Sequence, residues 1–242
     1  MKDQPIETNF IDYNSTFLAD VIEKNNLSKR QHKYGTDKGS THSYIKYFYQ
    51  PYFDCVGAPK KFLEIGIAGG ASLALWKLAF PESQITGCDI DVDSLHPICT
   101  KLLVSDNLKL VKGDAYSKDI FNTFGKNFDL IIDDGPHSIH TQIAALKYIE
   151  KLNGNGTLVI EDLGVTILTA LRLKYSLPRK IRKNARYLSF VSKSGKFDDA
   201  IFVYSKNKTV LDFMDKLKYR KRDFIYEFFN ELIRVFKYKI NL

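Results

Sequence analysis

The sequence predicts an α/β fold with a doubly wound, mostly parallel sheet. Between residues 61 and 162, short apolar runs of strand length alternate with helical patterns, which is typical of βαβ units. One apolar run, residues 61–65, leads directly into a glycine-rich turn and the start of a helix. Such a turn at the carboxyl end of a parallel strand builds a crevice of nucleotide size.

Length and composition agree with this prediction. The chain has 242 residues, 44% of them hydrophobic, which is enough to bury a core, and no Pro- or Ser-rich linker divides it. The three cysteines, Cys55, Cys88 and Cys99, lack metal-binding spacing and are interpreted as reduced residues, typical of the cytoplasm. No signal-peptide pattern and no apolar run of membrane-spanning length is present, so we expect a soluble cytoplasmic protein.

The expected elements follow in order along the chain. Residues 8–27 have a loosely helical apolar pattern, and residues 33–53 change from Gly, Thr and Ser to a helical run of aromatic residues. The apolar runs predict five parallel strands, at residues 61–65, 84–89, 108–111, 128–133 and 156–160. Two later runs, 187–191 and 200–204, are separated by a short turn and predict an antiparallel hairpin at the sheet edge. Residues after 208 are expected to be helical.

The turn after the first strand restricts the kind of ligand. Its glycines lack a Cβ atom and tolerate positive φ, so the backbone can approach a ligand closely. The Gly66-x-x-Gly69-Gly70 spacing departs from the dinucleotide fingerprint, and no Gly-Lys-Ser/Thr sequence of a P-loop follows. Glu64, just before the turn, would repel a pyrophosphate, so this site suits a cationic ligand better. Ser72 opens the helix that follows.

The sequence Glu64-Ile65-Gly66-x-x-x-Gly70 resembles the first motif of class I S-adenosylmethionine-dependent methyltransferases, whose ligand carries an amino group and a sulfonium. The runs around the next four predicted strands resemble later motifs of that family in the same order. The resemblance implies a Rossmann-like class I methyltransferase fold that binds S-adenosyl-L-methionine. The cofactor-binding residues that it implies are Glu64, Gly66, Gly70 and Ser72 near the methionine moiety, Asp89 on the ribose, Asp114 near the adenine, and Asp133.

Acidic residues and a histidine are grouped at the ends of the fourth and fifth predicted strands. The motif Asp-Asp-Gly-x-His occupies residues 133–137, and Glu-Asp occupies 161–162. The carboxyl ends of neighbouring parallel strands share one edge, which is the ligand face of an open sheet. Clustered carboxylates repel one another unless a positive charge lies between them, and Mg²⁺ would supply it. A bound cation lowers the pKa of a coordinated hydroxyl and a neutral histidine can accept its proton, which favours O-methylation.

The same cluster resembles the macrocin/mycinamicin-type sugar O-methyltransferases and the related cephalosporin-hydroxylase-like group, and so does the motif at residues 34–39. The roles that this resemblance implies are metal binding by Asp134, Glu161 and Asp162 and base catalysis by His137. Asp133 is an alternative metal ligand, because the sequence does not decide which aspartate points at the ion. Pro136 stands where a serine is usual in that group.

Each of these residues also has a simpler interpretation. Asp133 and Asp134 could cap a loop or accept hydrogen bonds from turn backbone, and Asp89 could be an ordinary acid in a turn after a strand. His137 could be a histidine without a catalytic role. Residues 36–39 could form a turn and nothing more.

The net charge of +8 raises the question of an anionic partner. Basic residues are concentrated at 174–186 and in the tail after residue 215. The first group could meet the phosphates of a nucleotide-linked sugar or an anionic glycan, with an ordinary solvated surface as the alternative. A nucleic-acid partner is not favoured, because the sequence has no N/D-P-P-Y base-methylation motif and no appended binding module.

Apolar residues recur at helical spacing between 224 and 236, with basic residues on both sides. Such an amphipathic helix could pack on the core or form the seam of a homo-oligomer. It could also lie on an anionic membrane, which would make the protein peripheral to the inner membrane surface.

The sequence thus predicts three regions: an N-terminal helical, acceptor-side segment at 1–55, a methyltransferase domain at 56–208 and a helical tail at 209–242. The expected function is Mg²⁺-dependent O-methylation of a sugar hydroxyl on a glycoconjugate or nucleotide sugar. The resemblance implies surface-polysaccharide or secondary-metabolite biosynthesis. One alternative is O-methylation of a catechol, an antibiotic or a phosphate ester. The other is a cofactor-binding module without methyl transfer, whose basic tail binds partners.

Overall fold

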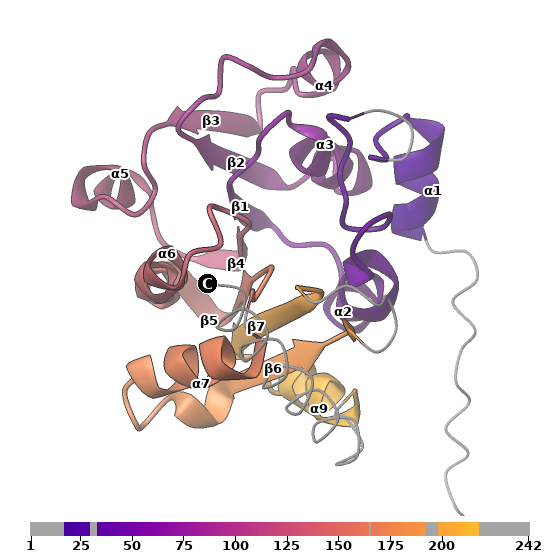
Figure 1. Ribbon diagram of the computed structural model, residues 1–242. Coiled ribbons are helices and arrows are strands. Elements are labelled where there is room, and N and C mark those ends of the chain that lie inside the picture. The colour runs from indigo at the N-terminus through magenta and orange to yellow at the C-terminus, as the bar shows by residue number, and fades with distance from the viewer. Residues whose placement is uncertain (1–16, 30–32, 165, 192–197, 218–242) are drawn as a thin grey trace, which may run out of the picture.

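The computed structural model describes residues 17–29, 33–164, 166–191 and 198–217. At its centre is a seven-stranded sheet with the strand order β3-β2-β1-β4-β5-β7-β6 (Figure 1). The strands are β1 Lys61–Ile65, β2 Gln84–Asp89, β3 Leu108–Lys112, β4 Phe128–Asp133, β5 Leu152–Ile160, β6 Ala185–Ser189 and β7 Ala200–Ser205. Strands β1 to β5 pair in parallel, and β7 runs antiparallel to both β5 and β6. The predicted α/β sheet with an antiparallel edge is therefore confirmed.

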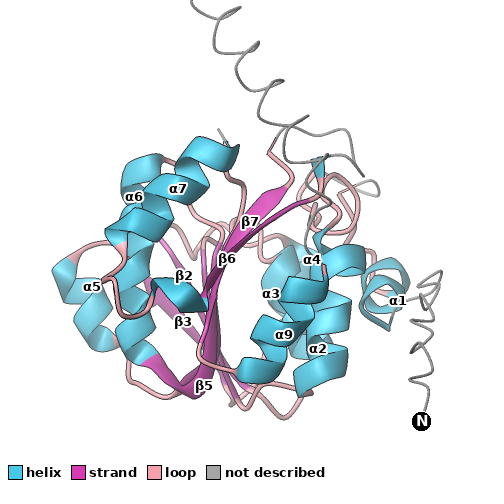
Figure 2. Ribbon diagram, turned by 90° about the horizontal axis from the view of Figure 1, so that it is seen from below, coloured by secondary structure: helices cyan, strands magenta, loops and turns pink. Residues whose placement is uncertain are grey.

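Helices cover both faces of the sheet (Figure 2). One face carries α5 Lys118–Thr123, α6 Ile139–Ala145 and α7 Thr166–Ser176. The other face carries α1 Phe17–Lys24, α2 Gln50–Val56, α3 Ala71–Ala79, α4 Pro97–Leu102 and α9 Lys208–Lys216. The described ranges also contain three short turns: the π-helical turn η1 Ile45–Tyr49, which leads into α2, and the 3₁₀ turns η2 Leu146–Lys151 and η3 Arg182–Asn184.

Each face of the sheet has its own hydrophobic core. In β1, Phe62 belongs to the core under α1, α2 and α3, whereas Leu63 and Ile65 belong to the core under α6 and α7. Successive side chains of a strand point to opposite faces, so a strand in the middle of a parallel sheet is apolar on both sides. This arrangement explains the continuous apolar runs that predict the central strands.

Local signals fix where the helices begin. Gly70 precedes α3 with a φ of 88°, a conformation that glycine adopts without steric cost. The hydroxyl of Ser117 accepts a hydrogen bond from the backbone N–H of Ile120 at 3.3 Å and caps α5. The hydroxyl of Ser138 accepts one from Thr141 at 3.2 Å and caps α6 in the same way. These caps hold the ends of the loops that follow β3 and β4.

Some expectations fall on residues that the structure does not describe. The predicted amphipathic helix at 224–236 and the turn at 193–196 lie outside the described ranges, as do residues 8–16 of the first helical pattern. The tail does begin as a helix, α9. The division at 1–55, 56–208 and 209–242 stays a prediction. Within the described ranges, no helix has the length and apolar character needed to cross a membrane.

Candidate functional site

A cavity of about 780 Å³ lies at the carboxyl ends of the central parallel strands. The loops after β1, β2, β3 and β4 build its walls, and residues 33–37 of the N-terminal segment add a further wall. This volume lies within the range of small-molecule and cofactor sites. The predicted site residues that line it are Gly66, Ser72, Asp89, Asp114, Asp134, His137 and Asp162.

The glycine turn is packed directly against the loop after β4. Gly66 has a φ of 80°, and a Cβ atom at this position would lie 2.1 Å from the carbonyl oxygen of Asp134. The backbone N–H of Asp134 donates to the carbonyl oxygen of Ile65 at 2.8 Å. Only glycine fits such a close approach with a left-handed backbone. The turn and the acidic loop are therefore held together as one unit.

Asp89, at the end of β2, holds the glycine turn in place. Its Oδ2 accepts hydrogen bonds from the backbone N–H groups of Ile67 at 2.9 Å and Ala68 at 3.0 Å. Its Oδ1 accepts one from the N–H of Asp91 at 3.1 Å. A carboxylate offers about four acceptor positions, so Asp89 retains capacity to accept a hydroxyl from a ligand in the cavity. The predicted ribose contact is compatible with this geometry and stays a prediction.

Glu64 and Asp133 are buried at strand ends and are not among the residues that line the cavity. Glu64 accepts a hydrogen bond from the indole N–H of Trp76 at 3.1 Å, and burial raises its pKa to about 7. Asp133 accepts one from the hydroxyl of Tyr116 at 2.5 Å, and burial raises its pKa to about 7 as well. Gly70, another predicted cofactor-binding residue, does not line the cavity either, and a Cβ atom at this position would lie 3.0 Å from the side chain of Leu95. These residues support the cavity wall from behind.

Besides Gly66, two more predicted residues of the adenine and methionine side line the cavity. Asp114 follows β3 and accepts a hydrogen bond from the N–H of Tyr116 at 2.8 Å, which fixes the loop that leads to α5. Ser72, in the first turn of α3, is buried and lines the cavity beside the glycine turn.

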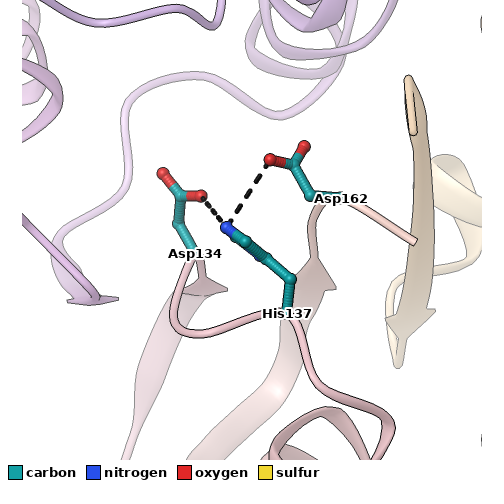
Figure 3. A group of neighbouring side chains, drawn as sticks. All are labelled: Asp134, His137 and Asp162. Carbon is teal, nitrogen blue, oxygen red and sulfur yellow. Dashed lines mark ion pairs between the residues drawn. The ribbon is translucent and has the colours of Figure 1, made fainter. Parts of the chain in front are cut away.

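Asp134, His137 and Asp162 converge on one point of the cavity wall (Figure 3). The Nε2 atom of His137 lies 3.9 Å from Asp134 Oδ1 and 3.6 Å from Asp162 Oδ2. One potential ligand atom from each of the three residues lies within 4.8 Å of the other two. The arrangement can therefore orient an imidazole between two carboxylates or hold a cation between them.

Two of these three residues have a left-handed backbone. The φ angles are 56° for His137 and 53° for Asp162. Aspartate and histidine tolerate this region better than most residues, but it remains uncommon outside glycine. Strained backbone of this kind is concentrated at functional sites. Here it turns the two side chains toward a shared point from two different loops.

Lys38 is a site residue that the sequence analysis does not identify. Its side chain is 1% exposed, and its ammonium nitrogen lies 2.5 Å from Glu161 Oε2 and 2.6 Å from Asp134 Oδ2. Burial lowers the pKa of Lys38, but the carboxylates of Asp134, Glu161 and Glu64 outweigh it and raise that pKa well above its usual value. The sequence analysis expects Mg²⁺ to supply the positive charge between the clustered acids. In the structure, the ammonium group of Lys38 supplies part of that charge.

The π-helical turn η1 and the residues before it also contact the acids. The hydroxyl of Tyr49 donates to Glu161 Oε1, and the hydroxyl of Tyr44 donates to Asp162 Oδ1 at 2.6 Å. His42, stacked on Tyr44, lies with its Nε2 atom 3.7 Å from Asp162 Oδ2. The motif at 34–39 and the aromatic run after it are the sequence signal for these contacts. The sequence alone does not reveal which side chains point inward.

No protein-family model matches the sequence. Over 156 residues the chain is 31% identical to the mycinamicin VI 2''-O-methyltransferase of Micromonospora griseorubida, a match that covers 58% of this chain and 36% of the relative. Over 152 residues it is 30% identical to the 8-demethyl-8-alpha-L-rhamnosyl tetracenomycin-C 2'-O-methyltransferase of Streptomyces olivaceus, covering 59% and 39%. The demethylmacrocin O-methyltransferase of Streptomyces fradiae is 28% identical over 162 residues, covering 62% and 39%. The matched regions thus span less than two fifths of these relatives.

Solved structures show the same fold. A methyltransferase of Podospora anserina bound to S-adenosylhomocysteine (SAH) superposes with a TM-score of 0.51 at 16% identity, covering 84% of this chain and 97% of that one. The O-methyltransferase of Bacillus cereus in complex with SAH has a TM-score of 0.52 at 16% identity, covering 78% and 90%. The fold is therefore that of class I S-adenosylmethionine-dependent methyltransferases. The resemblance to the macrocin and mycinamicin O-methyltransferases is confirmed as well.

Proposed function

We propose that the protein is an S-adenosylmethionine-dependent O-methyltransferase that acts on a sugar hydroxyl of a glycoside. The observation that carries this proposal is a single cavity with two kinds of wall. One wall is the glycine turn with Asp89, and the other is the group of Asp134, His137 and Asp162. A cofactor on the first wall would have its reactive end close to a base and two acids on the second.

The cavity fits the cofactor on chemical grounds. Gly66 has no Cβ atom where one would collide with Asp134, so the glycine turn can pack on the loop after β4 while Gly66 lines the cavity. Asp89 retains acceptor capacity for a ribose hydroxyl, and the loop at 113–116 is the expected neighbour of the adenine. The cofactor, when bound, supplies an electrophilic methyl group. The protein side chains must then orient an acceptor hydroxyl and remove its proton.

His137 is the proposed general base. Its side chain is 37% exposed and lies in the cavity wall, where an acceptor can reach it. Asp134 and Asp162 face its Nε2 atom from two sides, at 3.9 and 3.6 Å. Removal of that proton increases the nucleophilicity of the acceptor oxygen, which then attacks the methyl group. A positioned base of this kind contributes about 10²- to 10⁴-fold to a rate.

The residues also fit a divalent cation such as Mg²⁺. Asp134 and Asp162 are the carboxylates of the cluster that line the cavity, and Mg²⁺ prefers one or two carboxylates together with water. A cation held there would lower the pKa of an acceptor hydroxyl. Glu161 fits less well, because it is buried behind the cavity wall and already accepts hydrogen bonds from Lys38 and Tyr49. His137 stays the base in this proposal, since Mg²⁺ favours oxygen ligands over imidazole.

The names of the relatives support a glycoside as the acceptor. One relative is named for methyl transfer to a rhamnosyl tetracenomycin, and another for transfer to mycinamicin VI. We extend this to the present chain as a small glycoside acceptor and not a polymer of nucleotides. A catechol, an aglycone antibiotic or a phosphate ester would need the same base and is the second candidate.

The test begins with calorimetric titration of SAH, followed by methyl transfer to a panel of rhamnosides, nucleotide sugars and catechols. We expect SAH binding and transfer to at least one glycoside. The variant His137→Gln should lose about 100-fold or more in kcat with unchanged SAH affinity. His140→Gln, on the exposed side of α6 and away from the cavity, should match the wild type.

Three results would contradict parts of the proposal. Absence of SAH binding would refute the cofactor assignment. Transfer to catechols but to no glycoside would refute the acceptor class. Binding of SAH without transfer to any acceptor of the panel would favour a cofactor-binding module.

A further inference from the structure

Lys38 is bound by three carboxylates in the interior of the protein. Its ammonium nitrogen lies 2.5 Å from Glu161 Oε2, 2.6 Å from Asp134 Oδ2 and 3.8 Å from Glu64 Oε1. The side chains of Lys38, Glu64 and Glu161 are at most 2% exposed. A lysine ammonium has three N–H donors, and two of them are used in short charge-assisted hydrogen bonds. Breaking this group by removing one partner would leave an uncompensated charge in the interior.

Backbone hydrogen bonds on both sides of Lys38 fix the turn that carries its side chain. The carbonyl oxygen of Asp37 accepts hydrogen bonds from the N–H groups of Ser40, Thr41 and His42 at 2.9–3.1 Å. The carbonyl oxygen of Lys38 accepts one from Ile45 at 3.0 Å, at the start of η1. The residues before Lys38 are tied to the chain after α1, because the N–H of Thr36 donates to Leu27 at 2.7 Å. Lys38 is therefore part of an ordered turn.

Both oxygen atoms of Glu161 are engaged in the interior, away from the cavity. Its Oε2 accepts from Lys38, and its Oε1 accepts from the hydroxyl of Tyr49. Neither Glu161 nor Tyr49 is among the residues that line the cavity. A metal ion on Glu161 would lie beside the buried Lys38 ammonium, and its charge would oppose that of the lysine. Among the described residues, the group whose potential ligand atoms lie together consists of Asp134, His137 and Asp162, without Glu161.

Asp134 connects the buried group to the cavity. Its Oδ2 accepts from Lys38, while its Oδ1 faces His137 at 3.9 Å. Lys38 therefore fixes the orientation of Asp134 and occupies one of its two oxygens. Asp162 is held by Tyr44 at Oδ1, and its Oδ2 faces His137. One oxygen of each aspartate is thus turned toward the cavity.

We propose that Lys38 is the resident counter-ion of this site, and that Glu161 positions Lys38 and Asp134 and does not ligate a metal. The proposal deepens the methyltransferase function proposed above and rests on it. A divalent cation then has Asp134 Oδ1 and Asp162 Oδ2 as its protein ligands, with water at the other positions. Lys38 competes with the cation for Asp134, so removing the lysine strengthens metal binding.

The test measures Mn²⁺ binding by calorimetry and by the loss of the free-ion electron paramagnetic resonance signal. Asp162→Asn should weaken Mn²⁺ binding by at least about tenfold, as expected for a direct ligand. Glu161→Gln should leave it within about threefold of the wild type, because the side chain keeps its size and touches no metal. Lys38→Met should strengthen it, whereas loss of a merely structural contact would not. Lys112→Met, which removes an exposed lysine paired with Asp93, is the control and should change nothing.

The outcome depends on the comparison between these variants. Equal losses of Mn²⁺ affinity in Glu161→Gln and Asp162→Asn would overturn the proposal and make Glu161 a ligand. If Lys38→Met does not fold, the double variant Lys38→Met/Glu161→Gln removes both charges together, and it should fold and bind Mn²⁺ at least as tightly as the wild type. Weaker binding by that double variant would refute competition by Lys38.

Affinity for SAH is measured on every variant. Suppose that SAH binding is unchanged but Lys38→Met weakens Mn²⁺ binding and Glu161→Gln weakens it as much as Asp162→Asn. The proposed roles of Lys38 and Glu161 would then be refuted, and the methyltransferase proposal would stand. Absence of SAH binding by the wild type would instead refute the methyltransferase proposal.

Discussion

The ammonium nitrogen of Lys38 lies 2.5 Å from a carboxylate oxygen of Glu161, although 123 positions separate the two residues along the chain. This contact divides the clustered acids into two groups. Glu161 and Glu64 are buried beside the lysine, whereas Asp134 and Asp162 line the cavity. Substitutions in the buried group, in the cavity wall and in the glycine turn should therefore have different effects.

Replacement of Gly66 by alanine should destabilise the protein and weaken cofactor binding. The left-handed backbone at φ 80° alone costs an L residue about 1–2 kcal/mol, and the new Cβ would lie 2.1 Å from the carbonyl oxygen of Asp134. We expect the free energy of unfolding to fall by more than about 2 kcal/mol in urea denaturation. Gly154→Ala is the control, because nothing lies within 4 Å of a Cβ atom there. Equal losses in both variants would contradict the packing argument.

Asp89→Asn should weaken SAH binding by about 10- to 100-fold. The charged acceptor holds two N–H groups of the glycine turn, and hydrogen bonds to charged groups contribute about 1.5–3 kcal/mol each. Calorimetric titration of SAH gives the change directly. The matched variant Asp93→Asn alters an exposed aspartate on the same loop and should bind SAH as the wild type does. An Asp89→Asn variant with wild-type affinity would show that the turn is held without this carboxylate.

Tyr44→Phe should lower kcat and leave SAH affinity unchanged. The lost hydroxyl donates to Asp162 Oδ1 at 2.6 Å, so Asp162 loses one of the contacts that orient it. Stability should fall by about 1–3 kcal/mol, because a largely buried carboxylate loses its donor. Tyr47→Phe removes a hydroxyl from η1, the π-helical turn that follows Tyr44; its ring packs on Phe190, and the variant should change both quantities little. Similar losses of kcat in the two variants would exclude a specific effect on Asp162.

The buried carboxyl group of Glu64 should make stability depend on pH. Its pKa is raised by burial from 4.5 to about 7, so the folded protein holds this proton more tightly than the unfolded chain. Its contribution to stability is complete below about pH 4.5 and is lost as pH rises toward 7. Glu64→Gln removes this loss, so the variant should gain stability relative to the wild type between pH 5 and about pH 7.5. Denaturation curves of both proteins at the two pH values test this, and a constant difference would refute it.

Treatment with a chelator should reduce methyl transfer without reducing SAH affinity. The proposed cation ligands Asp134 and Asp162 are different residues from the proposed cofactor contacts of the glycine turn and Asp89, so we expect cofactor binding not to need the ion. Added Mg²⁺ should restore the rate in the wild type and restore it poorly in Asp162→Asn. A chelated enzyme with its full rate would show that His137 acts without a cation.

The strands and their order along the chain could be predicted because their signals are local. The runs of β1, β4 and β5 are buried on both faces, and each of the five parallel strands ends at or is followed by a glycine or an acid. The same reasoning places Asp89, Asp114 and Asp134 at one edge of the sheet, where the structure has them on the cavity. The antiparallel edge could be predicted from two late apolar runs.

The inward or outward direction of single side chains could not be predicted in this way. Glu64 lies on the same face of β1 as Phe62, and its carboxylate contacts Trp76. Alternation along a strand puts Glu64 and Phe62 on one face, but it does not say which face of the sheet that is. Asp133 and Asp134 are adjacent and therefore point to opposite sides, and the sequence does not say which one faces the cavity. Lys38 could not be assigned because its partners are 96 and 123 positions away.

The long sequence separation of these partners has a consequence for how the protein folds. Contacts between distant parts of a chain require loop closure first, and they form slowly. Until residues 38–49 dock, a half-assembled sheet would carry Glu64, Asp134 and Glu161 side by side with no ammonium between them. Mutual repulsion of these carboxylates would disfavour a partly assembled sheet relative to the fully assembled chain.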